Sequence, residues 1–505
     1  MSYTTKTDEK AQGRGWILAA LMFTTMLAAM DTTIVSTAIP HIVGDLGGFS
    51  LFSWVYSVYL LAQTVTIPLY GKLADLFGRK PVLIVGTVIF LIGSALSAAA
   101  WDMPSLVIFR GVQGLGAGSI MATVNTLAGD LYSVRERAYI QGWLSSVWGM
   151  AAILGPSLGG ALAEYVSWRW IFLINIPVGL IAIALLMLFL KEKVVKRQHH
   201  LDFVGAGLML ASGMLLIFTL MQSGQSWPWF SVMGITMMAV SVLLIMVTIR
   251  FEKRSPEPVM PDWIWRNRIL AGSNLAMIGM GAIMIGPSMY LPVFSQSVLG
   301  VGAIAAGLIL GSMTIGWPVA SSFSGRAYLR IGFRNTAAIG AAVIGLASLG
   351  FALMPYEASP WMLVANHVIL GAGFGLLSTP TLVGIQSIVP WKQRGVVTGG
   401  NMFSRYLGQS IGAAILGGVF NASMRNDLIK APKPIKNQLP QEVNDVIGVL
   451  QSGVAGNEAS DYLKHAFYIA THHVYGTMAL LAFLTLVVLL FLPARYPLAE
   501  DEKDS

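Results

Sequence analysis

Long apolar segments alternate with short polar connections along almost the whole chain. A helix that spans a bilayer needs about 20 apolar residues, and fourteen stretches reach that length. The pattern therefore predicts an all-α membrane protein whose fourteen spans cover residues 16–39, 52–71, 82–101, 105–129, 139–163, 168–190, 203–223, 228–250, 268–292, 301–323, 335–355, 360–385, 397–420 and 467–492.

Composition supports the same class. Apolar residues make up 55% of the chain and charged residues only 11%, whereas an average soluble protein carries about 25% charged residues. So few charges would not cover the surface of a soluble protein of this size. The chain has no Cys, which excludes disulfides and thiolate metal sites. The first apolar segment lacks a small-residue cleavage site, so we expect a retained helix instead of a signal peptide.

The basic residues predict the orientation. Lys and Arg accumulate in short loops on the cytoplasmic side. With the N-terminus inside, most of the 32 Lys and Arg residues fall in inward segments, and the short outward loops hold only Arg169. We therefore expect a multi-pass protein of the cell membrane with both termini in the cytoplasm. The net charge of +8 follows from this topology and does not indicate nucleic-acid binding.

Two motifs recur at nearly constant offset and indicate an internal repeat. The segment that begins at Gly71 returns in degraded form at Gly325, and the segment from Arg110 to Gly118 aligns with that from His367 to Gly375. Parallel repeats are typical of transporter halves that enclose a midplane site. The predicted organisation is a cytoplasmic N-tail 1–15, a six-helix bundle 16–190, an inserted helix pair 203–250, a second six-helix bundle 268–492 that includes an outward loop 421–466, and a cytoplasmic C-tail 493–505.

Asp31 is an acid inside the first apolar segment. An ionisable group in hydrocarbon costs several kcal/mol unless it is paired, wetted or neutralised by a proton. Asp31 and Arg110 are predicted about 12 Å and 8 Å below the outer boundary, at 1.5 Å per residue, so they can face each other. Arg stays charged, whereas Asp protonates when burial disfavours its charged form. The hypothesis is that Asp31 binds and releases a proton and that Arg110 sets its proton affinity; a purely structural ion pair is the alternative.

The polar loop after the second span combines two glycines with charged residues. Its sequence is Gly71-Lys-Leu-Ala-Asp75-Leu-Phe-Gly78-Arg79-Lys80. The glycines permit a tight turn close to neighbouring helices, and Asp75 is placed to meet a helix N-terminus or an Arg. We expect this loop to latch the cytoplasmic face, with a generic basic turn as the alternative.

Together these motifs resemble signatures of the major facilitator superfamily. The first two are the Gly71–Lys80 loop and Arg110-Gly-Val-Gln-Gly114-Leu-Gly116, and a third, Gly155-Pro156-Ser-Leu-Gly159-Gly160, resembles a mark of its antiporters. Fourteen spans and Asp31-Thr-Thr-Ile-Val resemble its fourteen-span drug:proton antiporter family, and this resemblance covers nearly the whole chain. It implies the major facilitator fold and efflux of drugs or other amphiphilic compounds in exchange for protons, with antibiotic resistance as a consequence.

The glycines and proline of the fifth span, Gly155, Pro156, Gly159 and Gly160, form a kinked face of small residues. Small residues let helices approach closely in lipid, and Pro removes a backbone hydrogen bond. The functional hypothesis is a hinge, or a tight seal against a partner helix that limits leakage. Simple helix packing is the alternative.

Two further ionisable residues lie inside predicted spans. Arg405 is a candidate to neutralise an anionic substrate group, or it snorkels to the cytoplasm. His367 occupies the repeat position of Arg110 and is a candidate second protonation site, with a hydrogen-bonded interior His as the alternative. Flexible Met and aromatic residues suit a pocket that accepts varied ligands, with a lipid-facing or core position as the alternative for each. The candidates for the substrate pocket are Met26, Met30, Trp54, Tyr59, Gln63, Trp143, Trp148 and Asn274.

No phosphate-binding Gly-x-x-x-x-Gly-Lys-Ser/Thr loop is present, so we expect a proton gradient to drive transport, with no cofactor, no metal site and no enzymatic activity. Loop 421–466 is a candidate gate or docking site, with a passive linker as the alternative, and binding of a periplasmic adaptor is left open. The predicted function is proton-coupled efflux of amphiphilic small molecules by alternating access. A transporter of a single metabolite and a non-transporting lipid-handling or sensor protein are the alternatives.

Overall fold

A computed structural model describes residues 5–47, 51–192, 203–223, 227–228, 230–255, 258–436, 438–440, 446 and 457–497. These residues are almost entirely helical, which confirms the predicted all-α class. The elements are α1 (Thr5–Leu46), α2 (Phe52–Phe77), α3 (Arg79–Ala98), α4 (Met103–Leu131), α5 (Val134–Tyr165), α6 (Trp170–Leu173), α7 (Asn175–Phe189), α8 (Phe203–Gln222), α9 (Val232–Glu252), α10 (Trp263–Arg266), α11 (Arg268–Ser297), α12 (Ala303–Gly311), α13 (Met313–Ile331), α14 (Phe333–Ala352), α15 (Pro360–Ser387), the 3₁₀ turn η2 (Trp391–Gln393), α16 (Arg394–Lys430), α17 (Lys433–Lys436) and α19 (Asn457–Leu490).

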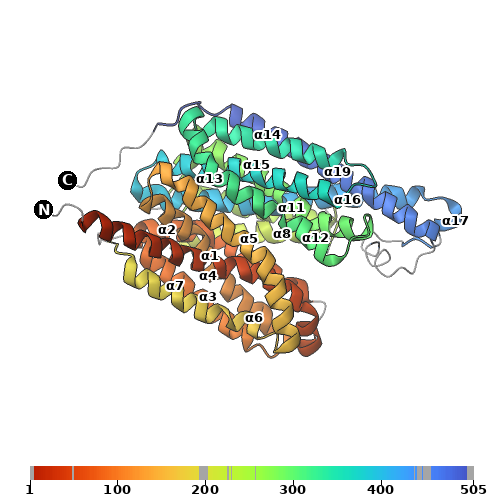
Figure 1. The fold of residues 1–505 in the computed structure, drawn as a ribbon, viewed down its shortest axis with the longest axis horizontal. Coiled ribbons are helices and arrows are strands. Elements are labelled where there is room, and N and C mark those ends of the chain that lie inside the picture. The colour runs from red at the N-terminus through yellow and green to blue at the C-terminus, as the bar shows by residue number, and fades with distance from the viewer. Residues whose placement is uncertain are drawn as a thin grey trace.

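The helices form two bundles that lie side by side (Figure 1). In the first bundle α4 packs between α2 and α3, and α1 packs against α5 and α7. In the second, α15 packs between α13 and α14, and α11 packs against α16 and α19. The start of α1 and the end of α19 lie at the same end of the molecule (Figure 1). We call this the inner end, after the predicted orientation, and the opposite one the outer end.

Glycines at matching positions show how the repeat shapes both bundles. Gly78 and Gly332 separate α2 from α3 and α13 from α14, with φ of 95° and 87°, a region that side chains other than glycine rarely adopt. A Cβ at Gly114 would overlap the backbone of α2, and a Cβ at the equivalent Gly371 would overlap the backbone of α13. The two motif alignments therefore correspond to equivalent turns and equivalent helix contacts.

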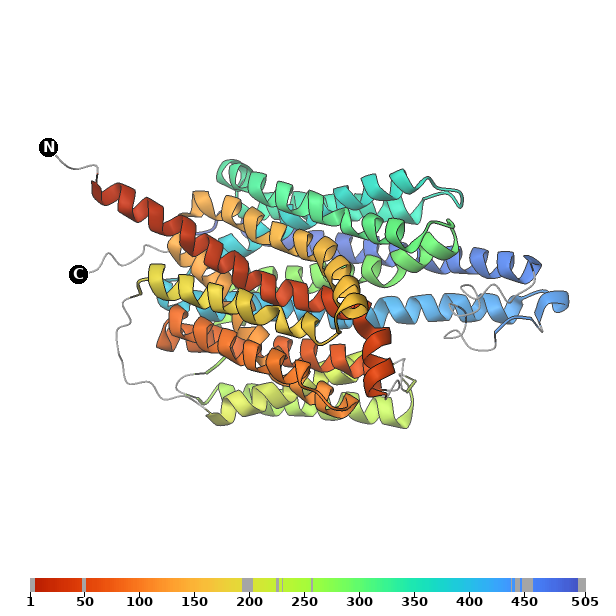
Figure 2. The same cartoon turned by 60° about the horizontal axis from the view of Figure 1, so that its bottom comes forward.

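The two bundles meet along two seams. In one seam α2 packs against α16, and in the other α5 packs against α13. The repeat relates α2 to α13 and α5 to α16, so the two seams are equivalents of each other. The inserted helices α8 and α9 pack together beside the first seam (Figure 2), where α8 contacts both α2 and α16. The rings of Trp54 on α2 and Phe218 on α8 stack with centroids 5.6 Å apart.

Twelve helices among the described residues are long and apolar enough to cross a membrane. The predicted spans 52–71 and 397–420 correspond to α2 and α16, which are long helices but are not among those twelve. Both carry polar residues in their middle, Gln63 in α2 and Asn401 and Arg405 in α16, and such residues lower the mean hydropathy of a span. The count of fourteen spans stays a prediction.

Helices run past several predicted span boundaries, because hydropathy marks apolar length and not helix length. Helix α1 extends beyond span 16–39 at both ends. The predicted outward loop 421–466 is largely helical where it is described, since α16 continues to Lys430 and α19 begins at Asn457. Residues 441–445 and 447–456 of that loop lie outside the described residues, as do parts of both predicted tails.

We predict that a disulfide can join the two bundles across the α5/α13 seam. A Cβ at Gly142 would lie 3.1 Å from Ser322 Cβ, close to the 3.5–4.5 Å that disulfides span. In this chain without native cysteine, the variant Gly142→Cys/Ser322→Cys should become resistant to labelling with polyethylene-glycol maleimide after mild oxidation, and reduction should restore labelling. The matched control is Gly160→Cys/Ser322→Cys, because Gly160 has open space around it. Equal labelling of both variants after oxidation would contradict the seam.

Candidate functional site

Asp31 on α1 and Arg110 on α4 face each other in the interior of the first bundle. Arg110 Nη1 donates a hydrogen bond to Asp31 Oδ2 over 2.6 Å, and both side chains are fully buried. The structure thus brings together the two residues whose depths matched in the sequence. Removing one partner of such a buried pair costs about 3–5 kcal/mol, because the other charge is left uncompensated.

Gln113 completes this pair as a three-residue cluster. Its Nε2 donates to Asp31 Oδ1 over 2.8 Å, and its Oε1 accepts from Arg110 Nη1 over 2.8 Å. Both oxygens of the carboxylate therefore accept a hydrogen bond. The sequence interpretation missed Gln113, although its spacing of three residues from Arg110 places both on one face of α4.

Groups from neighbouring helices enclose the guanidinium of Arg110. Its Nε donates to the Val55 carbonyl of α2 over 3.3 Å. Its Cζ lies 4.2 Å from the ring centroid of Tyr59 and 5.7 Å from that of Phe172, and aromatic faces attract cations. Because the pair is buried and the local dielectric is low, the electrostatic energy of the Arg110 charge depends strongly on whether Asp31 is ionised.

Arg79, the first residue of α3, is the centre of the contact between the bundles at the inner end. It is fully buried, and its guanidinium donates to Asp75 Oδ1 over 2.8 Å and to Asp130 Oδ2 over 2.9 Å. It also donates to the carbonyl of Trp391 over 2.6 Å and lies 3.7 Å from the centroid of the Trp391 ring. Since Trp391 belongs to the second bundle, one guanidinium joins acids of the first bundle to the second.

Asp75 binds the N-terminus of α16 across the same seam. Its two carboxylate oxygens accept from the backbone N–H groups of Gly395 and Val396 over 2.9 and 2.7 Å, where the helix dipole favours a negative charge. The sequence predicted that Asp75 would meet a helix N-terminus or an Arg, and the structure shows both contacts. Gly71 permits the close approach, because a Cβ there would lie 2.5 Å from the Gly395 oxygen.

The position of Asp75, beyond the predicted span 52–71, links this contact to pH. Burial raises the pKa of Asp75 to about 7, although Arg79 and the two backbone N–H groups oppose that rise. Because the pKa of Asp75 is raised while it contacts α16, a fall in pH through about 7 toward the ordinary pKa of 3.8 stabilises this contact. The stabilisation is lost as pH rises above about 7.

Further contacts hold the bundles together at the inner end. Arg394 Nη1 donates to Asp130 Oδ1 over 3.3 Å, and Gln386 Nε2 donates to the Asn125 carbonyl over 3.0 Å. The Tyr328 hydroxyl donates to the Val134 carbonyl. Sequence reasoning missed these residues, and for Asp130 the only signal was an acid at the end of an apolar segment. Lys80, the last residue of the loop motif, lies apart and donates to the Leu190 carbonyl over 2.7 Å.

Within the small-residue face of α5, Gly155 packs against α1. Gly155 lies so close to Thr33 that a Cβ would overlap its side chain, and Thr33 Oγ1 donates to the Ala151 carbonyl over 2.9 Å. Gly159 is buried, whereas Gly160 has open space around it. Pro156 lies within α5, but its side chain is outside the described part. The partner helix for the predicted seal is thus α1, the helix that carries Asp31.

His367 and Arg405 do not join the Asp31 cluster. His367 on α15 is fully buried, and the Leu310 carbonyl faces its ring without closing a hydrogen bond of good geometry. The Phe351 ring lies edge-on at 5.9 Å between centroids. Arg405 lies on α16 with its Cζ 5.0 Å from the Tyr406 ring centroid.

The eight pocket candidates separate into three groups. Tyr59 stands beside Arg110, Gln63 is buried one turn further along α2, and Asn274 on α11 accepts a hydrogen bond from Asn401. Met26, Met30 and Trp148 belong to the apolar packing around α1. In contrast, Trp54 stacks on inserted α8, and Trp143 is exposed on α5 beside Tyr139, so these two are not brought to the site.

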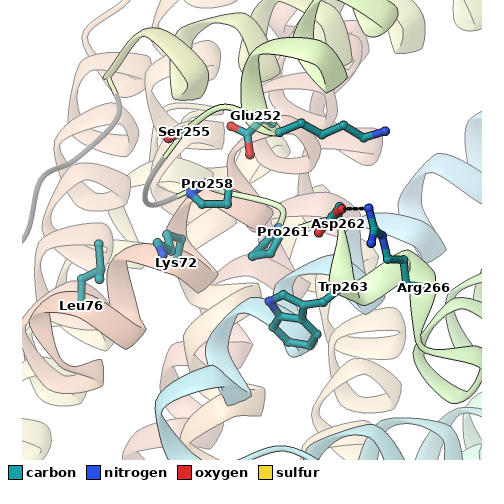
Figure 3. Close-up of a pocket in the computed structure, with 10 residues that line it drawn as sticks. Lys72, Leu76, Glu252, Ser255, Pro258, Pro261, Asp262, Trp263 and Arg266 are labelled. Atoms are coloured by element: carbon teal, nitrogen blue, oxygen red, sulfur yellow. Dashed lines mark ion pairs between the residues drawn. The ribbon is translucent and has the colours of Figure 1, made fainter.

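A separate pocket of about 620 Å³ lies at the inner end of α2. Lys72 and Leu76 of α2 face the linker that joins α9 to α11, and Figure 3 shows Pro258 and Pro261 of that linker opposite them. Arg266 is paired with Asp262 over 2.8 Å. Lys72 stands one turn before Asp75 on α2, so the linker of the inserted pair lies near the part of α2 that carries Asp75.

Comparison with known proteins identifies the family of this chain. The family model of the Major Facilitator Superfamily matches residues 21–413. The chain belongs to the Major Facilitator Superfamily. As a member of this superfamily it is a multi-pass membrane transporter and not an enzyme.

Relatives within the superfamily include efflux proteins. The chain is 32% identical to the multidrug transporter protein MdtP of Bacillus subtilis over 450 residues, which are 89% of this chain and 83% of the relative. It is also 32% identical to multidrug resistance protein 3 of Bacillus subtilis, over 88% of each chain. The efflux pump FUS6 of Gibberella moniliformis is 31% identical over 84% of this chain and 77% of the pump.

Solved structures of other transporters share the fold. The crystal structure of the human organic anion transporter MFSD10 aligns with a TM-score of 0.64 at 14% identity and covers 94% of this chain and 99% of its own. A bacterial homologue of the iron transporter ferroportin, in its outward-facing state, aligns with a TM-score of 0.60 at 13% identity and covers 95% and 98%. At such low identity these likenesses show the major facilitator fold alone.

We predict that Asp75→Asn weakens the closed inner end of the transporter. Asparagine has a single side-chain oxygen, which accepts from one of the two backbone N–H groups, while its NH₂ group repels the other. A buried N–H left without a partner costs about 1–3 kcal/mol, so hydrogen–deuterium exchange of the peptide 394–397 should become about tenfold faster or more. Asp45→Asn is the matched control, because Asp45 pairs with Arg169 at the other end. Unchanged exchange in 394–397 would show that Asp75 does not hold α16.

Proposed function

We propose that this transporter exports amphiphilic small molecules in exchange for protons, with Asp31 as the proton carrier and Arg110 as the group that sets its proton affinity. The observation that carries the proposal is the buried cluster of Asp31, Arg110 and Gln113. The printed names of relatives that cover most of the chain, a multidrug transporter and a multidrug resistance protein, support the substrate class.

The cluster suits proton exchange because only one of its members can change charge easily. The guanidinium stays protonated, and Gln113 is neutral, so Asp31 is the group that binds or releases the proton. When Asp31 is protonated, its ion pair with Arg110 is lost and the contact between α1 and α4 weakens. Proton binding and the packing of these two helices are thus linked in one equilibrium.

Alternating access needs a contact that can close and open, and under this proposal the contact between the bundles at the inner end has that role. In this structure Arg79 and Asp75 join the bundles there, so the arrangement is closed at the inner end. Helix α4 carries Arg110 in its outer part and Asp130 of the inner contact at its other end, about 30 Å away at 1.5 Å per residue. A shift of α4 after protonation of Asp31 therefore acts on the inner contact.

The remaining parts of the proposal concern energy and place. The transporter works in the cell membrane with both termini in the cytoplasm, which is the orientation that the basic residues favour. The proton gradient drives export, and no cofactor takes part. Under this orientation the Arg79 contact closes the cytoplasmic side, and its release admits substrates from the cytoplasm.

We predict that Asp31→Asn abolishes proton coupling. Asparagine keeps one hydrogen-bond acceptor for Arg110 but does not exchange a proton. Pyranine trapped in proteoliposomes reports proton movement when cationic, neutral or anionic amphiphiles are added. With wild-type protein at least part of this panel should move protons, and with Asp31→Asn that movement should fall at least tenfold.

The control for this experiment is Asp45→Asn on the same helix. Asp45 is half exposed and paired with Arg169 over 2.7 Å, so its variant should keep the wild-type rate. Proton movement at the wild-type rate in Asp31→Asn would remove Asp31 from the coupling step. Failure of every amphiphile to move protons with the wild-type protein would reject proton-coupled efflux itself.

A further inference from the structure

Arg405 on α16 is a cation in the interior without a counter-charge among the described residues. It lies eight residues inside the predicted span 397–420, about 12 Å from its boundary. Its Nε is buried without a hydrogen-bond partner, and within the described ranges no ion pair involves it. A cation in such a place is costly unless something neutralises it.

Three acids with buried carboxylates among the described residues are already paired with other arginines, and the buried Glu252 lies in the pocket at the inner end of α2, where it accepts a hydrogen bond from the Met260 N–H. Asp31 pairs with Arg110, while Asp75 and Asp130 pair with Arg79. The seam beside α16 therefore keeps the positive charge of Arg405. This charge attracts an anion from outside the protein and repels a cation.

Buried amides with unused hydrogen-bonding atoms lie beside Arg405. Asn401 stands one turn before Arg405 on α16 and is fully buried. Its Nδ2 donates to Asn274 Oδ1 over 3.3 Å, but its own Oδ1 has no partner in the described part of the chain. Gln63 on α2 is equally buried, and neither atom of its amide group has a partner there.

The packing of α2 against α16 places Gln63 at the height of Arg405. The two helices run antiparallel, because Gly71 lies against Gly395 at the inner end while Leu61 and Val65 share one apolar cluster with Phe403 and Leu407. Gln63 stands between Leu61 and Val65, and Arg405 between Phe403 and Leu407. Gln63 and Arg405 thus stand at one level of the seam.

We propose that Arg405, together with Asn401 and Gln63, binds the carboxylate or sulfonate group of an anionic amphiphile. A guanidinium offers several donors in a planar fork that matches such a group. The neighbouring Met402 and Tyr406 are part of the buried apolar cluster of this seam and provide a surface for the apolar body. That the bound anion is a transported substrate rests on the proposed function, whereas the binding itself does not.

Two fluorescent probes that differ only in the anionic group test this site. They are 1-anilinonaphthalene-8-sulfonate and the neutral N-phenyl-1-naphthylamine, titrated against the full-length protein in phosphatidylcholine nanodiscs without a pH gradient. Arg405→Gln should weaken binding of the sulfonate about tenfold or more and change binding of the neutral probe less than twofold. Arg405→Lys should restore part of the sulfonate affinity, because it keeps the charge but not the fork.

The matched control is Arg425→Gln, since Arg425 is exposed on the same helix and its loss should change neither titration. The proposed site would be rejected if Arg405→Gln weakened binding of both probes equally, or if it left binding of the sulfonate unchanged. The outcome is separable from the proposed function. Sulfonate selectivity without proton movement in the pyranine experiment would reject proton-coupled efflux and keep this site, whereas proton movement without selectivity would do the reverse.

Discussion

The ion pair of Asp31 and Arg110 is the interaction on which the first bundle depends most. Leaving either charge alone in the buried interior is costly, so each stabilises the other. Gln113 satisfies the second carboxylate oxygen, and Val55 contributes a carbonyl from α2. The cluster therefore holds α1, α2 and α4 together, and under the proposed function a proton on Asp31 changes that packing.

The repeat turns this local event into one that involves both bundles. Equivalent glycines let α4 pack closely on α2 and α15 pack closely on α13, and the seams α2/α16 and α5/α13 are equivalents of each other. The two halves differ, however, in their charges. His367 occupies the position of Arg110, and no acid among the described residues pairs with it. The proposed proton carrier therefore lies in the first bundle and the proposed anion site in the second.

Much of this arrangement was predictable from the sequence, because single residues in an apolar segment are conspicuous. Asp31 and Arg110 matched in depth, and the position of Asp75 after Gly71 indicated contact with a helix N-terminus. Gln113 and Trp391 were not found, because an amide or a backbone carbonyl becomes a partner only through tertiary packing. Hydropathy also missed the helical parts of 421–466, because it does not separate a polar helix from a polar loop.

The protonation state of Asp31 is tested most directly by infrared difference spectroscopy of the purified protein. A protonated carboxylic acid has a carbonyl stretch that an ionised carboxylate lacks. We expect a band of this kind to appear as pH falls, to disappear when an exported amphiphile is added, and to be absent in Asp31→Asn. A spectrum in which Asp31→Asn leaves every pH-dependent and ligand-dependent carboxyl band unchanged would contradict the claim that Asp31 carries the proton.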